Sequence, residues 1–549
     1  MTGRVAVLGG GIGGLTAAHE LALRGFAVEV FDAKSIPGGK SRTIPVPGSG
    51  VAGRQELPGE HGFRFFPSFY VHLPESMSRI PFGPDGATCA DNLIGVQVIN
   101  VARYDHPGID LLARMPRSIS DLKILFHELF GGVSPLSEGD LTFFAGKLWQ
   151  VMTSCEERRY AELEPQSWWN FVDAGPRGEA YQKFLAEGLS RSLVAARAQE
   201  GSARTVGQIQ VRLAEGIIAG TLGTDRVLSL PTSEALLNPW IAEIERHGGV
   251  YHRETIVTAI TMANGRIASV TVTAPDGERV IVADQFVSAI PIEQFARLIT
   301  PDMLAADPGL QNVIDLAPNV RWMNGIQFFL TEDPDLVFGH SLYVDSPWAI
   351  TSISEAQLWK TMDLSSYGDG KVRGVLSVDI SDWDKAGTLI PSAAKDLPLD
   401  KIAEEVWYEL KRAQNVGGRE VLRDDMLHSW FVDTDIELDH ADRPHPRANL
   451  EPLFINTPNS WDKRPIAVTA IPNLTLASDY VQTKTDLACM EAANEAARRA
   501  VNGILAATGS DAEPCKLWHM GMPKGLAPWR AHDRTRFEQG LPWDGHLLF

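Results

Sequence analysis

The chain has 549 residues, of which 44% are hydrophobic and 8% aromatic. Because single domains usually stop growing at about 250 to 300 residues, this length predicts two or more globular domains. The chain carries 50 Lys and Arg against 69 Asp and Glu, a net charge of −19. Such a surface repels phosphate backbones, so the composition excludes nucleic acid as a partner.

The cysteines and the apolar runs indicate the compartment. Cys89, Cys155, Cys489 and Cys515 are scattered with no CxxC pair, which fits a reducing compartment and predicts neither a disulfide framework nor a metal site. No stretch reaches the roughly 18 apolar residues of a membrane span, and a glycine-rich loop at Gly9 leaves no room for a signal peptide. We therefore expect a cytoplasmic protein, with peripheral membrane contact at most.

The N-terminus predicts a βαβ unit. The apolar run Val5–Leu8 is typical of a buried parallel strand, and Gly9, Gly11 and Gly14 follow as G-x-G-x-x-G. The first glycine permits a tight turn, the second lets the backbone approach a pyrophosphate, and the third lets the helix pack on its strand. Apolar residues then recur at helical spacing until Gly25, which is placed to end the helix.

An acidic residue follows the second predicted strand, where a dinucleotide-binding unit has its ribose contact. The second predicted strand, Ala27–Phe31, ends at Asp32, 18 residues after Gly14. A carboxylate there can accept both ribose hydroxyls of an adenosine and disfavours a 2′-phosphate. Strand, loop, helix and acid together predict dinucleotide binding.

A second glycine pair follows in "AKSIPGGKSRT", with Lys40 and Arg42 beside it. The two basic side chains could hold a pyrophosphate or flank a flavin. They could equally form a solvated basic loop around a turn. These residues alone leave both interpretations open.

Four segments carry a family resemblance. "GGGIGGLTAAHELA", "PGGKSR", "GEHGFRFF" and "NLTLASDYVQTKTDLACMEAANEAARRAVNGIL" occur in the order found in the flavin-containing amine oxidase and phytoene desaturase superfamily. The chain most resembles its bacterial carotenoid desaturase-like and hydroxysqualene dehydroxylase-like branch. The matching segments cover about a third of the chain, all in the predicted cofactor half.

The resemblance implies an α/β fold in which a discontinuous, Rossmann-type (GR2-like) FAD-binding domain carries an inserted α+β substrate domain. We expect the FAD domain at 1–95, 232–295 and 441–510, and the substrate domain at 96–231 and 296–440. A C-terminal arm, 511–549, could cap a tunnel mouth, hold a partner chain or touch a membrane.

Within the inserted parts, residues 111–231 read as mostly helical, while Gly325–Leu330 and Val372–Ile380 have the composition of strands. A dense aromatic group could line an apolar channel or form ordinary core. Its members are Phe143, Phe144, Trp149, Trp168, Trp169 and Phe171.

The resemblance implies FAD as cofactor. It places Asp479 at the ribityl–pyrophosphate part and the N-terminus of a helix opening near Met490 at the pyrimidine end of the isoalloxazine, where a helix dipole favours the charge of a reduced flavin. Ser478, Ala492 and Ala497 stand where the family usually has glycine. The residues expected at FAD are Gly9, Gly11, Ile12, Gly13, Gly14, Asp32, Ala33, Lys34, Gly39, Lys40, Ser41, Arg42, Gly62, Phe63, Arg64, Val257, Ala289, Ser478, Asp479, Met490, Glu491 and Ala493.

The implied reaction is hydride transfer to flavin N5 from a long hydrophobic isoprenoid, by carotenoid-precursor desaturation or squalene-type dehydroxylation, with quinone or oxygen as the open choice of acceptor. No catalytic residue stands out. His61, Arg64 and His428 are candidates, each of which could also have a purely structural role. Alternatives are a flavin amine oxidase, a flavin-dependent isomerase or cyclase without net redox change, and a prenyl-binding escort-type protein. No metal-ligand spacing is found.

Overall fold

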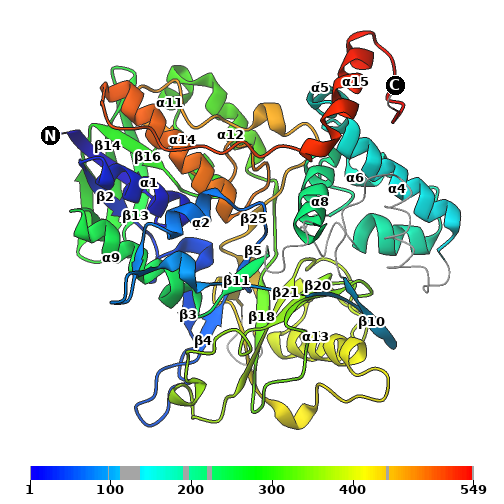
Figure 1. The fold of residues 1–549 in the computed structure, drawn as a ribbon. Coiled ribbons are helices and arrows are strands. Elements are labelled where there is room, and N and C mark those ends of the chain that lie inside the picture. Colours follow the sequence, from blue (N-terminus) through cyan, green and yellow to red (C-terminus); the bar gives the residue numbers. More distant parts are fainter. Residues whose placement is uncertain are drawn as a thin grey trace.

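Three groups of elements make up the structure, a computed structural model that describes residues 2–96, 98–111, 136–188, 197–218, 225–439 and 444–546. In Figure 1 a sheet covered by helices lies on the left, a second sheet lies at the lower right, and a helical group lies at the upper right. The expected α/β architecture is confirmed.

The first sheet is five-stranded and parallel, in the order β12-β2-β1-β16-β26. Its strands come from parts of the chain far apart in sequence, so the chain leaves this sheet and returns to it twice. Helix α1 (Ile12–Leu23) follows β1, and α14 (Met490–Thr508) follows β26, beginning at the predicted residue. The strands are β1 (Thr2–Leu8), β2 (Phe26–Phe31), β12 (Val250–His252), β16 (Gln285–Ser288) and β26 (Leu474–Leu476).

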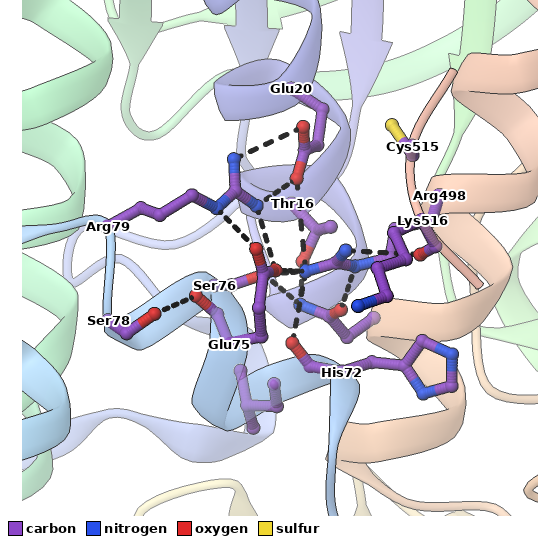
Figure 2. Close-up of polar contacts among 12 residues, drawn as sticks. Thr16, Glu20, His72, Glu75, Ser76, Ser78, Arg79, Arg498, Cys515 and Lys516 are labelled. Atoms are coloured by element: carbon purple, nitrogen blue, oxygen red, sulfur yellow. Dashed lines mark hydrogen bonds and ion pairs between the residues drawn. The ribbon is translucent and has the colours of Figure 1, made fainter. Parts of the chain in front are cut away.

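A buried polar network joins α14 to α1 and to α2 (His72–Met77), as Figure 2 shows. The guanidinium of Arg498 is 1% exposed. It pairs with Glu75 and donates to Ser76 Oγ at 2.9 Å and to Asn494 Oδ1 at 2.9 Å. These contacts hold α14, near the C-terminus, against α1 and α2, near the N-terminus. The two loop-to-helix junctions therefore lie in one rigid unit.

Smaller elements surround this sheet. The antiparallel sheet β13-β14-β15 and helices α9 to α12 pack around it, and short strand pairs connect it to the second sheet. The helices are α9 (Asn238–Arg246), α10 (Ile292–Leu298), α11 (Pro301–Ala306) and α12 (Gln311–Leu316). The strands are β13 (Ile256–Ala263), β14 (Arg266–Ala274), β15 (Gly277–Ile281), β3 (Thr43–Pro45), β4 (Pro58–Glu60), β5 (Phe65–Phe66), β6 (Pro81–Phe82), β7 (Ala87–Thr88), β8 (Leu93–Gly95), β11 (Arg226–Leu228), β17 (Val320–Arg321), β25 (Leu453–Phe454), β23 (Ile436–Leu438) and β24 (Pro446–Asn449).

The second sheet has seven strands in the order β10-β9-β19-β20-β21-β18-β22, antiparallel except for the β9–β19 pair. Helix α13 (Leu399–Gln414) covers one face, where Trp407 packs against Phe328. Both strands predicted here are found, one of them starting two residues later than expected. The strands are β9 (Val98–Arg103), β10 (His106–Leu111), β18 (Gly325–Leu330), β19 (Gly339–Tyr343), β20 (Ile350–Ser354), β21 (Gly374–Ile380) and β22 (Leu427–Val432).

The helical group contains the predicted aromatic cluster. Phe144, Trp149, Trp168 and Phe171 are buried in one hydrophobic core, so these four form core rather than a channel wall. The stretch 111–231 is mostly helical where it is described, with β11 as an exception; residues 112–135, 189–196 and 219–224 lie outside the described residues. The helices are α4 (Glu138–Thr153), α5 (Glu156–Arg158), α6 (Trp168–Phe171), α8 (Ala203–Ile218) and α15 (Ala527–Glu538).

Candidate cofactor and catalytic site

Four of the five glycines of the first loop show different purposes. A Cβ on Gly13 would lie 1.8 Å from the Ala477 carbonyl oxygen, and one on Gly14 would lie 1.9 Å from the Gly9 oxygen, so protein packing requires both glycines. Gly9 has φ +101°, a conformation that favours glycine. At Gly11 a Cβ would meet nothing closer than 3.9 Å. Packing does not require a glycine there, so its bare face is left to a ligand, as the predicted pyrophosphate contact needs.

Helix α1 presents its N-terminus at the same place. Gly11 is the N-cap, no side chain caps the helix, and the first turn contains no acidic residue. Uncapped N–H groups and the positive end of the helix dipole favour a pyrophosphate. The loop therefore fits the dinucleotide cofactor that the sequence predicts.

The carboxylate predicted to bind ribose has a partner that the sequence did not reveal. Asp32 is 5% exposed, and its Oδ2 accepts a hydrogen bond from the Tyr251 hydroxyl, which also donates to the Gly10 carbonyl at 3.1 Å. Burial raises the pKa of Asp32, and the hydrogen bonds from Tyr251 and the Lys34 N–H oppose that rise. Tyr251 lies on β12, next to β2, a pairing that only the fold reveals.

The second glycine turn lies against the first. Gly38 forms a parallel bridge to Gly11, and its N–H donates to the Gly10 carbonyl at 3.2 Å. Gly38 and Gly39 have φ +110° and +57°, which explains the glycine pair. The two glycine turns therefore meet at the mouth of the first loop.

The basic side chains on either side of this turn already have protein partners. Lys34 pairs with Asp435 at 2.7 Å and with Glu451 at 3.1 Å, and Arg42 pairs with Asp435 at 2.6 Å. The Lys40 ammonium donates to the Pro452 carbonyl. These contacts tie the turn to the segment that returns from the second sheet. Their predicted contact with the pyrophosphate stays a prediction.

Two buried polar atoms without partners lie around Asp479. The Tyr480 hydroxyl and Glu293 Oε1 have no hydrogen-bond partner in the described ranges, and both groups interact electrostatically with Asp479. Burial raises the pKa of Glu293 and of Tyr480. A hydroxyl-rich chain such as ribityl would satisfy both atoms, so this place also fits FAD. Ser478 Oγ donates to Asp479 at 3.3 Å.

The N-terminal turns of α14 and α1 meet. A Cβ on Gly13 would lie 3.6 Å from the Ala493 oxygen, and Asn494 Nδ2 donates to Thr16 Oγ1 at 2.8 Å. These contacts place the first turn of α14 beside the first turn of α1. Two helix N-termini thus converge, as expected if both junctions hold one cofactor.

The Glu491 carboxylate binds protein groups rather than facing a cofactor. Its carboxylate is fully buried and accepts the backbone N–H groups of Val71, His72 and Leu73 at 2.7 to 2.9 Å, together with His72 Nδ1. It caps α2, so its side chain is not free to face a cofactor. Its backbone N–H interacts with the Tyr70 hydroxyl and the Cys489 thiol, and the predicted cofactor contact of Glu491 stays a prediction.

A group of buried acids lies beside the segment "GEHGFR". Asp379, on β21, is so close that a Cβ on Gly62 would lie 1.8 Å from its Oδ1. Burial raises the pKa of Asp379 to about 7; Arg64 lowers it and Glu60 raises it further. Burial also raises the pKa of Glu355, which is 5% exposed and has no hydrogen bond from its carboxylate in the described part of the chain.

Of the catalytic candidates, His61 and Arg64 lie together. His61 Nδ1 bonds Asp433, while its Nε2 is buried without a hydrogen-bond partner among the described residues. Burial alone would raise the pKa of Asp433, but the hydrogen bond and charge of His61, together with the Asp435 N–H and Arg42, lower the pKa to about 2. Arg64 donates to the Lys40 carbonyl at 3.0 Å.

His428 does not join this group. It lies on β22 beside the far end of β18 and pairs with Asp369 at 3.2 Å, whereas Asp433, the partner of His61, follows the opposite end of the strand. The four residues from His428 to Val432 span about 13 Å of strand. This separation removes His428 from the candidate site.

The remaining predicted contacts lie around the first loop and the second turn. The Ala289 N–H donates to the Leu8 carbonyl at 2.8 Å, which puts Ala289 over Gly9. Val257 is half-buried on β13, and the Ser41 carbonyl accepts from Arg64. Where the chain is described, no cluster of His, Cys, Asp and Glu could hold a metal ion, and no helix is long and apolar enough to cross a membrane.

Two family models match the chain. Residues 7–77 match an NAD(P)-binding Rossmann-like domain, and residues 208–505, more than half of the chain, match the flavin-containing amine oxidoreductases. Hydroxyneurosporene desaturase of Rubrivivax gelatinosus is 36% identical over 121 residues. That match spans 21% of this chain and only 20% of the desaturase.

Solved structures share the fold over nearly the whole chain. An oxidoreductase from Methanosarcina mazei has a TM-score of 0.57 at 15% identity, covering 92% of this chain and 100% of its own. Cyclohexylamine oxidase from Brevibacterium oxydans has a TM-score of 0.57 at 12% identity, covering 93% and 99%. At these identities the likeness shows the fold alone.

Proposed function

Since this chain belongs to the flavin-containing amine oxidoreductase family, we propose that it is an FAD-dependent oxidoreductase that dehydrogenates a long hydrophobic isoprenoid. The family membership gives the cofactor and the reaction class. The observation that carries the substrate class is the 36% identity to a carotenoid desaturase. The substrate is then a carotenoid precursor or a squalene-type compound, and the electron acceptor is a quinone or oxygen.

The chain supplies the cofactor site from both junctions. The bare face of Gly11 and the N-terminus of α1 hold the pyrophosphate, and Asp32 holds the ribose hydroxyls once Tyr251 yields its hydrogen bond. Asp479, with the Tyr480 hydroxyl and Glu293 beside it, receives the ribityl chain. Bound FAD supplies a hydride acceptor at N5.

The buried acids can accept the proton that dehydrogenation releases. Dehydrogenation removes a hydride from one carbon and a proton from its neighbour, so the two electrons leave with the hydride and the proton needs an acceptor. An acid with a pKa of about 7, such as Asp379, is suited to take a proton and release it near neutral pH. Arg64 limits how far burial raises that pKa.

One observation favours an amine substrate instead. Glu60, Glu355 and Asp379 are three carboxylates around a single guanidinium, that of Arg64, and this excess of acid would suit a cationic substrate. Some relatives of the same fold, such as cyclohexylamine oxidase, are amine oxidases by name. Flavin amine oxidation is therefore the second candidate.

Anaerobic mixing distinguishes the candidates. FAD-loaded protein is mixed with acyclic carotenoid precursors and squalene-type compounds in detergent, and separately with a panel of primary amines. The proposal predicts that the isoprenoids bleach the oxidised-flavin absorption and yield a product two hydrogen atoms lighter by mass spectrometry. Bleaching by amines alone would replace it with amine oxidation, and a product of unchanged mass would replace it with isomerisation or cyclisation.

A further inference from the structure

A basic cleft lies at the corner where the C-terminal arm meets the helical group. In Figure 1, α15 stands beside α5 and above α8 at this corner. The cleft has a volume of about 530 Å³, in the range of small-molecule sites. Seven Lys and Arg side chains line it against two carboxylates, Glu156 and Asp486, a local excess of five positive charges in a chain of net charge −19.

Arg159 differs from the other cations of this cleft because its buried guanidinium is unpaired among the described residues. It is 7% exposed, yet its guanidinium has no hydrogen bond or ion pair in the described part of the chain, and Nη1 is buried without a partner. Burying an unpaired charge costs several kcal/mol. Burial lowers the pKa of Arg159 to about 10; Glu156 opposes this, and Arg530, Arg212 and Arg204 lower it further. A site built from protein alone would not leave such a cation uncompensated.

Its neighbours are held in place by other groups. Arg204 pairs with Glu164 at 2.9 Å and Asp486 at 2.8 Å, and it stacks on the rings of Tyr160 and Trp461. Arg212 donates to the carbonyl oxygens of the adjoining loop and of the arm at 2.7 to 3.2 Å. The cations around Arg159 are therefore positioned before any ligand arrives, which lowers the entropic cost of binding.

We propose that this cleft binds an anion that carries phosphoryl groups, with Arg159 as the central ligand. Guanidinium groups match phosphate oxygens in geometry, and several converging cations favour a multiply charged group such as a diphosphate over a single carboxylate. None of the residues that line the cleft belongs to the first glycine loop or to the second glycine turn. The ligand is a soluble phosphate ester or diphosphate, or the phosphate headgroup of a lipid, because both present the same chemistry.

Calorimetric titration with inorganic diphosphate tests the site in the full-length protein at low salt. Excess FAD is present so that the glycine loop is occupied. Arg159→Gln should weaken diphosphate binding about tenfold or more, because a charged hydrogen bond of roughly 1.5 kcal/mol or more is lost. Arg266→Gln, which removes the same charge at the exposed start of β14, should leave binding unchanged. Equal binding by R159Q and wild type, or equal weakening by R159Q and R266Q, would overturn the proposal.

Thermal unfolding gives a second readout that does not depend on flavin chemistry. Without ligand, R159Q should be at least as stable as wild type because an uncompensated buried charge is gone. Diphosphate should raise the Tm of the wild type and not that of R159Q. If R159Q is destabilised and diphosphate raises both Tm values equally, Arg159 is structural and the proposal is wrong.

Vesicle flotation then separates the two sources of phosphate. Wild type that floats with phosphatidic acid vesicles, when R159Q does not and soluble diphosphate competes, identifies a lipid headgroup. Wild type that ignores those vesicles but binds diphosphate identifies a soluble phosphate ester. Binding to pure phosphatidylcholine vesicles by both proteins alike would show an apolar membrane contact and contradict a role for Arg159 in it.

Discussion

Among single residues, Gly11 separates cofactor binding from folding. It has φ −76° and ψ −173°, and it has room for a Cβ, so Gly11→Ala should change stability by about 1 kcal/mol or less while FAD binding is lost, because the entropy gain from alanine offsets its weaker preference for an N-cap. Gly14→Ala is the matched control: its Cβ overlaps the Gly9 oxygen and should destabilise the fold by about 1 to 3 kcal/mol. Urea unfolding and FAD titration measure both effects. A G11A variant that binds FAD normally would contradict this assignment.

The Tyr251 hydroxyl should weaken FAD binding. Its hydroxyl holds Asp32, so the ribose must break that hydrogen bond to bind. Tyr251→Phe should lower the Kd of FAD about fivefold, since one hydrogen bond of roughly 1 kcal/mol no longer competes. Tyr343→Phe, whose hydroxyl bonds Ser352 in the second sheet, should leave the Kd unchanged in the same fluorescence titration. Weaker binding by Y251F would show that the hydroxyl supports the cofactor instead.

Asp379 should couple activity to pH. Its pKa is raised from 3.8 to about 7, so between these values the folded chain keeps a proton that the unfolded chain loses. Stability therefore falls as pH rises through this window, and the penalty is complete above pH 7. Asp379→Asn should raise the Tm above pH 7, converge with wild type near pH 4, and lower kcat about 100-fold. If Asp379→Asn shows the stability gain but an unchanged kcat, Asp379 does not take part in catalysis.

Sequence patterns could predict the glycine loop and Asp32 but not Asp379, Glu355 or Tyr251. The first set is read from spacing along a single βαβ unit. Tyr251 lies on β12 of the first sheet, whereas Asp379 and Glu355 lie on or directly after strands of the second sheet, so each reaches Asp32 or Arg64 only through pairing of distant segments. Glu491 shows a further limit: its position at a helix start indicates a cofactor contact, and the sequence gives no sign that its carboxylate caps α2.

For whole elements, the contact of α14 with α1 and α2 depends on Arg498. Arg498→Met should cost about 3 to 5 kcal/mol because Glu75 and the buried amide of Asn494 lose their partner. Arg499→Met is the control on the next residue. Its side chain is 32% exposed and, among the described residues, pairs with Glu495 alone, so its loss should cost about 1 kcal/mol or less. Denaturant unfolding of both variants measures the difference, and equal costs would show that the buried network adds nothing.

Element type was predictable where the apolar pattern was strong, as in Val5–Leu8, Gly325–Leu330 and the helix from Met490. The aromatic cluster left two interpretations open because aromatic density is the same in a core and in a channel wall. Its burial against Trp529 of α15 decides for core in this part of the molecule.

For the whole molecule, distant segments of the chain meet in one sheet. The order β12-β2-β1-β16-β26 brings strands from both ends of the chain together, so the two loop-to-helix junctions face one site. The domain boundaries predicted from the sequence stay predictions. The C-terminal arm is fixed to the helical group, since Asp533 pairs with the buried Arg158 at 2.9 Å.

The absorption spectrum of the purified protein, followed during anaerobic reduction with dithionite, tests the central claim most directly. The two-junction FAD site predicts oxidised-flavin bands, in the protein as purified or after addition of FAD, that bleach on reduction and are absent in G11A. A colourless protein that takes up no added FAD would contradict the oxidoreductase assignment, and an escort-type binding protein on the same fold would take its place.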